Sequence, residues 1–143
     1  MRVDDYRVVP SFISSAFTGK ALAVHDQGNQ TRTFCYITDA IVGFLKVLLN
    51  GKNGDIYNVG NDAPEINMVG LATMIHELFD NKPVVKLIAY PDSYPADEPK
   101  RRCPDLTKIK TELGYRPSVS LREGLRRTIA WYRDIIPPEQ HNA

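Results

Sequence analysis

Apolar side chains at helical spacing recur five times along the chain, and four of these stripes end at a glycine or at a proline pair. A glycine or proline placed just after such a stripe is a helix stop. Short, separate helices are therefore expected, and they cover residues 7–18, 38–50, 67–79, 105–113 and 120–136. Only short strands fit between them.

Strands are expected where β-branched and aromatic residues cluster between the helices, over 21–26, 31–37, 55–59 and 84–89. Three polar residues stand where helices should begin. Thr38 and Asn67 are predicted N-caps, and Ser120 opens a capping box with Glu123. The order of elements predicts an α+β fold, with about five helices and three or four short strands, rather than a regular βαβ series.

The length of 143 residues fits a single domain over 1–143. Residues 91–104 hold four prolines and several charges, and such a long loop is predicted to be functional. Residues 137–143 follow a proline pair and are expected to be a frayed tail.

Eighteen basic and seventeen acidic side chains nearly cancel, which gives no support to nucleic-acid binding. No apolar run approaches the ~20 residues of a membrane span, and the N-terminus has no signal-peptide pattern. Two cysteines are too few for a disulfide scaffold. We therefore expect a cytoplasmic protein without a membrane partner.

Several catalytic motifs are absent from the sequence. No glycine-rich dinucleotide or nucleotide loop occurs, and no C-x-x-C, H-E-x-x-H or G-x-S-x-G is present. None of the seven tyrosines has a lysine four residues later. No metal ligands and no catalytic residues are predicted, and we expect the chain alone neither to bind NAD tightly nor to turn over a substrate.

Five strings nevertheless resemble, in order, segments of the extended short-chain dehydrogenase/reductases, the NAD-dependent nucleotide-sugar epimerases and dehydratases. They are LAVHDQGNQTRTFCYITD over 22–39, DIYNVGN over 55–61, RCPD over 102–105, LGYRP over 113–117 and LREGL over 121–125. Within this family the chain most resembles UDP-glucuronate decarboxylases and dTDP-glucose 4,6-dehydratases.

The resemblance implies the C-terminal, substrate-binding portion of a Rossmann-type enzyme, with the Rossmann half absent. It implies NAD as the cofactor of the complete enzyme and a UDP- or dTDP-sugar as its substrate. Partners would be the missing Rossmann half or a partner chain, and a second copy in a homodimer. The complete enzyme would be a lyase, an epimerase or a dehydratase.

Substrate-binding residues also follow from the resemblance. Arg32 matches the arginine of a Q-x-R motif and Arg102 that of R-x-P-D, and both are expected to hold the diphosphate from separate loops on opposite sides. Arg101 would replace Arg102 if the register shifts by one residue. Val9, Phe12, Val24 and His25 match the base pocket, although their spacing alone would make them core or surface residues.

Two alternatives remain open at this point. The chain could be a stand-alone, non-catalytic protein that binds nucleotide sugars or a partner chain. It could also be an oligomerisation protein without a ligand.

Overall fold

The computed structural model describes residue 5 and residues 7–91 and 99–136. Residues 92–98 of the predicted functional loop 91–104, and all of the tail 137–143, lie outside these residues. The chain forms two compact units. The first comprises Met1–Gln30, Asn67–Lys100 and Leu125–Ala143, and the second comprises Thr31–Ile66 and Arg101–Gly124.

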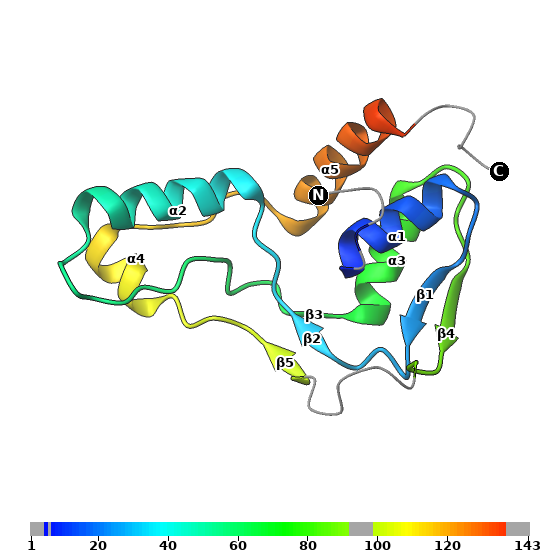
Figure 1. The fold of residues 1–143 in the computed structure, drawn as a ribbon, viewed down its shortest axis with the longest axis horizontal. Coiled ribbons are helices and arrows are strands. Elements are labelled where there is room, and N and C mark those ends of the chain that lie inside the picture. Colours follow the sequence, from blue (N-terminus) through cyan, green and yellow to red (C-terminus); the bar gives the residue numbers. More distant parts are fainter. Residues whose placement is uncertain (1–4, 6, 92–98, 137–143) are drawn as a thin grey trace. The chain divides into compact units, whose positions relative to one another are not determined.

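The first unit is built on two parallel strands, β1 (Leu22–His25) and β4 (Val85–Ile88), which lie side by side in Figure 1. The helices α1 (Val8–Phe17) and α3 (Met68–Leu78) pack against each other and against β1. Phe17 and Phe79 meet edge to face, with ring centroids 5.0 Å apart. The other buried side chains of these elements include Phe12, Ile13, Ala16, Leu22, Val24, Leu71, Ala72 and Ile75.

The second unit holds the helices α2 (Ile37–Asn50) and α4 (Thr107–Leu113) and the strands β2 (Thr31–Arg32) and β5 (Arg101–Arg102). With β3 (Ile66–Asn67), these strands form a sheet in the order β3-β2-β5. The core of this unit consists of Leu106, Ile109 and Tyr115, and the partly buried Val47, Tyr57, Val59 and Leu113 pack around it.

Helix α5 (Leu121–Ile135) follows the predicted stripe. Its start is capped as expected, since the Ser120 hydroxyl oxygen accepts a hydrogen bond from the backbone N–H of Glu123 at 3.2 Å. The Asn67 cap is likewise confirmed by a 2.7 Å bond from the N–H of Gly70. Leu121, Leu125, Ile129, Tyr132 and Ile136 are all buried.

Three local predictions are wrong. The N-cap of α2 is Tyr36, not Thr38, and it makes no side-chain cap bond. Residues 55–59 form no strand, and the strand expected over 31–37 has only two residues. Both segments are rich in strand-forming residues, but β-strand propensity depends strongly on tertiary context, and only Thr31 and Arg32 pair with a neighbouring strand.

The α+β class is also corrected. The five expected helices are present, but the described residues contain five strands, and the two pairs β1–β4 and β2–β5 are both parallel. Parallel pairs joined through helices are characteristic of α/β proteins. The composition of a short strand does not show the direction of its neighbour, so the parallel pairing could not be predicted from these residues. No helix in the described part of the chain is long and apolar enough to cross a membrane.

The Ser120 cap predicts a measurable contribution to stability. We expect Ser120→Ala to lower the free energy of unfolding by about 0.5–2 kcal/mol, because an N–H of the first turn loses its partner. Thr38→Ala is the matched control, since Thr38 lies inside α2 and caps nothing in the structure. Thermal melts of both variants test this, and an equal fall in Tm for the two would contradict it.

Candidate functional site

Arg32 and Arg102 are register partners in the parallel pair β2–β5. Residues that pair directly across two strands project to the same face of the sheet, on strands about 4.8 Å apart. The side chains of Arg32 and Arg102 therefore start from the same face of the sheet. Arg32 is half-buried, its guanidinium donates to the Thr31 carbonyl oxygen at 2.8 Å, and Arg102 is exposed. The expected arrangement on two separate loops is replaced by two adjacent strands.

The other face of the same two strands is organised by Glu65. Thr31 and Arg101 are partners in the register. Both donate to the Glu65 carboxylate, the arginine through Nε at 2.9 and 3.0 Å and through Nη2 at 2.8 Å. Hydrogen bonds from Arg101, and then from Thr31, lower the pKa of Glu65 below its ordinary value. Arg101 is thus held by a carboxylate on the face away from Arg32 and Arg102.

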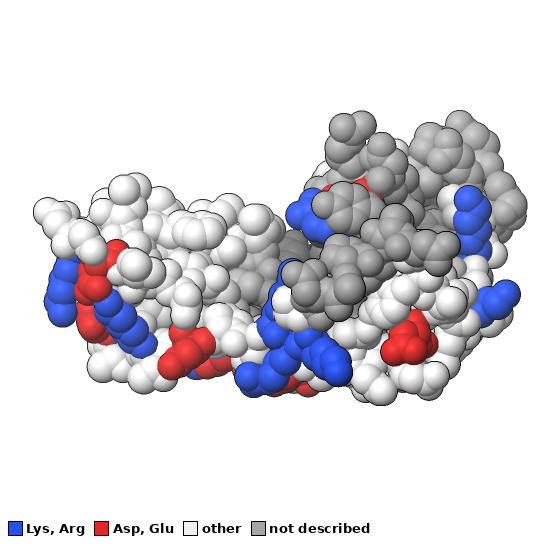
Figure 2. Space-filling view, turned by 60° about the horizontal axis from the view of Figure 1, so that its bottom comes forward, with Lys and Arg blue, Asp and Glu red and all other residues white. Residues whose placement is uncertain are grey.

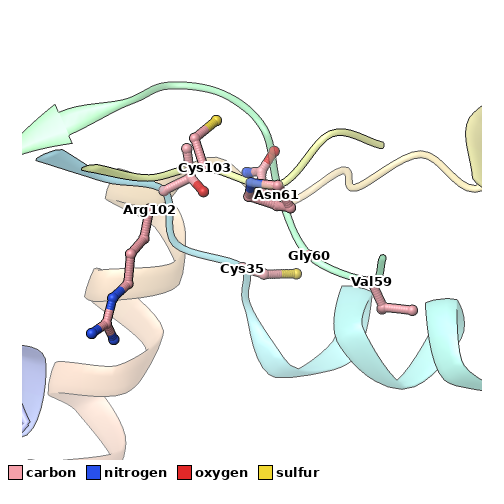
Figure 3. A pocket seen from close by; sticks show the side chains of 8 residues that line it. Cys35, Val59, Gly60, Asn61, Arg102 and Cys103 are labelled. Atoms are coloured by element: carbon pink, nitrogen blue, oxygen red, sulfur yellow. The ribbon is translucent and has the colours of Figure 1, made fainter. Parts of the chain in front are cut away.

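An open pocket of about 410 Å³ lies next to these strands in the second unit. In Figure 3 the Arg102 side chain extends away from the Cys103 side chain, as expected for consecutive residues of an extended segment. Both thiols of the chain reach this pocket. The lining residues are Thr33, Cys35, Val59, Gly60, Asn61, Arg102, Cys103 and Pro104.

Tyr115 supports one side of this pocket from the core. Its side chain is fully buried, and its hydroxyl donates to the Gly60 carbonyl oxygen at 2.7 Å. The Cys35 sulfur lies 3.6 Å from the same hydroxyl. Burial raises the pKa of the Cys35 thiol, so the protonated form is favoured and the sulfur is a poor nucleophile near neutral pH.

Two buried polar residues fix the loops around the pocket. The Asn61 amide donates to the Phe34 carbonyl oxygen, and its side-chain oxygen accepts from the N–H of Ala63, both at 3.3 Å. The Asp39 carboxylate accepts from the N–H groups of Ser118 and Val119, at 3.0 and 2.9 Å. Asn61 therefore holds the backbone that follows β2, and Asp39 ties the start of α2 to the segment that precedes α5.

The lysines of α4 are paired with carboxylates of their own unit. Lys108 contacts Asp55, and Lys110 contacts Asp62. On the face shown in Figure 2, basic and acidic side chains adjoin one another. These contacts neutralise the charge of both lysines within the second unit.

The predicted base-pocket residues all lie in the first unit. Phe12 and Val24 are 2% and 1% exposed, and Val9 is half-buried on α1. His25 ends β1 and packs edge to face on Tyr90, with ring centroids 5.2 Å apart. Core packing accounts for Phe12 and Val24, and a role in base binding remains a prediction for all four.

Sequence reasoning did not identify Glu65 or Tyr115 as site residues. Glu65 follows a proline in a loop. Tyr115 belongs to the LGYRP motif over 113–117, but that motif assigned no role to it. Their partners lie 36 and 55 positions away in the sequence, so no local spacing could have revealed either contact. Among the described residues, no group of three or more His, Cys, Asp or Glu side chains could hold a metal ion.

Residues 2–60 match the model of the NAD dependent epimerase/dehydratase family. The chain is 42% identical over 125 residues to UDP-glucuronic acid decarboxylase 5 of Arabidopsis thaliana, an alignment that covers 87% of this chain and 35% of that protein. The chain therefore belongs to this family, and it is homologous to part of the UDP-glucuronate decarboxylases and dTDP-glucose dehydratases. It spans about a third of the length of the curated relatives that it matches.

Solved structures agree with this assignment. The UDP-glucuronic acid 4-epimerase of Bacillus cereus, in complex with UDP-glucuronic acid and NAD, superposes with a TM-score of 0.81 at 28% identity, covering 94% of this chain and 41% of the epimerase. The dTDP-glucose 4,6-dehydratase of Streptomyces venezuelae, with NAD bound, superposes with a TM-score of 0.77 at 30% identity, covering 90% and 38%.

These matches correct the predicted fold class in a second respect. The model of an NAD-dependent family aligns with residues 2–60, within the segment that was expected to belong to a C-terminal portion with the Rossmann half absent. That expectation is wrong. The chain has an α/β fold and corresponds to part of the length of its relatives, two of which were solved with NAD bound.

The Tyr115 hydroxyl predicts a pH-dependent contribution to stability. We expect Tyr115→Phe to lower the free energy of unfolding by about 0.5–1.5 kcal/mol at neutral pH, since the Gly60 carbonyl oxygen loses its donor. Burial raises the pKa of Tyr115 above its ordinary value of 10.0. Above pH 10 the unfolded state loses this proton first, so the wild type loses stability as the pH rises and the variant loses less.

Urea unfolding at several pH values between 7 and 11 measures both effects. Tyr57→Phe is the matched control, because the exposed Tyr57 hydroxyl donates to Glu112 at 2.8 Å. Identical pH dependence in the wild type and in Tyr115→Phe would show that this tyrosine does not titrate as expected.

Proposed function

We propose that this chain is the substrate-binding part of a nucleotide-sugar epimerase, dehydratase or decarboxylase, and that it holds the diphosphate of a UDP- or dTDP-sugar. One observation carries the proposal, namely the register that pairs Arg32 with Arg102 on one face of the β2–β5 pair. The B. cereus relative binds UDP-glucuronic acid, a ligand of the proposed class.

The charge arrangement supports a diphosphate in particular. Two like charges directly opposite each other across paired strands repel, and an anion placed between them offsets this repulsion. A guanidinium presents parallel N–H donors that match two oxygens of a phosphate group. Two neighbouring guanidinium groups can therefore engage the two phosphates of one diphosphate. Arg101 is less suited to this role because both Glu65 oxygens already accept from it.

NAD belongs, in this proposal, to the complete enzyme. A tight dinucleotide site needs a glycine-rich turn between a strand and a helix, where the backbone can approach the pyrophosphate. In this chain β1 leads through a turn to β2, and a Cβ at Gly28 would lie 2.5 Å from Val24 and 2.7 Å from Val69. The side chains of Val24 and Val69 therefore occupy the space beside this turn, and a dinucleotide does not fit there. The proposed task of the chain is to bind and orient the sugar nucleotide.

The proposal predicts that Arg32→Ala and Arg102→Ala each weaken UDP binding. Each lost charge-assisted contact is worth about 1.5–3 kcal/mol, or roughly 10- to 150-fold in Kd. Lys100→Ala is the control, since an exposed lysine beside the strand should contribute little. Calorimetric titrations with UDP and with uridine measure the difference, and an equal loss in all three variants would indicate a diffuse basic patch instead of this site.

A second candidate function, oligomerisation, is favoured by the surface of α2. Seven large apolar side chains of this helix are between 47% and 78% exposed. Asp39 and Lys46 are its only charged residues, and both contact their own unit through Ser118 and Leu113. We propose that a second copy of the chain covers this apolar face, which comprises Ile37, Ile41, Val42, Phe44, Leu45, Leu48 and Leu49.

This alternative predicts concentration-dependent self-association that the double substitution Leu48→Lys and Leu49→Lys abolishes. Leu87→Lys is the control, because Leu87 is also about half exposed but lies on β4. Sedimentation velocity over a hundredfold range of concentration provides the measurement. A wild type that remains monomeric throughout would rule out the second copy, whereas retained UDP binding by the double variant would separate the two functions.

A further inference from the structure

We infer that Glu65 is a positioning residue that determines which arginine of β5 faces the ligand. This inference rests on the proposed diphosphate site. Glu65 lies next to β3, yet its carboxylate accepts from Thr31 on β2 and from Arg101 on β5. One side chain thus connects the edge of the sheet to both strands that carry the arginine pair.

The register of β2 against β5 is weakly determined by the backbone alone. Each strand has two residues, and the backbone bond that extends the pair runs from the N–H of Thr33 to the Arg102 carbonyl oxygen at 3.2 Å. A slip of one residue moves every side chain to the other face. Such a slip would turn Arg101 toward the ligand face and Arg102 away from it. Both are arginines, so the sequence of β5 does not by itself select one.

The Glu65 contacts supply this selection. A carboxylate that accepts from both Nε and Nη2 fixes the plane of the guanidinium, and this holds Arg101 on the face of Thr31. Because Arg101 is fixed on that face, its neighbour Arg102 projects to the opposite face, beside Arg32. Glu65 therefore acts on the diphosphate through the strand register, with no contact to the ligand required.

The test measures the Kd values of UDP and UMP for the full chain and for Glu65→Gln. We expect the affinity for UDP to fall about three- to thirtyfold, and that for UMP to fall less, because one phosphate needs only one of the paired arginines. Arg101→Gln removes the other partner of the same contact. The double variant should lose no more than either single variant, since all three lack the same bridge.

Glu112→Gln is the matched control, because Glu112 is another carboxylate of the second unit and pairs with Lys52 and Tyr57. It should leave the ratio of UDP to UMP affinity unchanged. Circular dichroism melts show whether each variant is folded. If Glu65→Gln does not fold, Thr31→Val and Arg101→Gln give the same test from the other partners of the carboxylate.

The outcomes separate this inference from the proposed function. If Arg32→Ala and Arg102→Ala weaken UDP binding while Glu65→Gln and Arg101→Gln do not, the site stands and Glu65 has no positioning role. Equal loss of UDP and UMP affinity with a lower Tm would show a merely structural ion pair and overturn the inference. UDP binding that none of these substitutions changes would overturn the proposed site, and the inference with it.

Discussion

The parallel pairing of β2 with β5 is the contact on which the candidate site depends. It involves only two residues from each strand, but it places one arginine pair on one face and the Glu65 contacts on the other. The surrounding loops are fixed by buried polar groups, among them Asp39 and Asn61, that satisfy backbone partners. Such groups are costly to bury without partners, so each one specifies a single backbone path.

The two faces of this strand pair carry different charged groups. On one face Arg101 and Glu65 neutralise each other within the protein. On the other face Arg32 and Arg102 are direct partners in the register of the two strands. The same short sheet thus carries the Arg101–Glu65 ion pair on one face and, on the other, the two arginines for which we propose diphosphate binding.

Sequence reasoning predicted the helices well because their signals are local. The Ser120 and Asn67 caps and the buried stripe of α5 all follow from spacing within a few turns. It failed on the short strands, since two residues carry no period and parallel direction is a tertiary property. For the site, the sequence indicated Arg32 and Arg102 through family motifs, but not that they are neighbours. Glu65 depends on contacts across 36 positions, which spacing does not reveal.

The pairing of Arg32 with Arg102 also has a consequence for the order of folding. These partners are 70 positions apart, so a long loop must close before two residues of strand can form. Contacts of this kind are slow to form and form late, after helices whose contacts are local. During synthesis from the N-terminus, Arg32 exists for the whole interval in which residues 33–101 are added, without its partner. The cationic pair can therefore arise only near the end of translation of this segment, once β5 has left the ribosome.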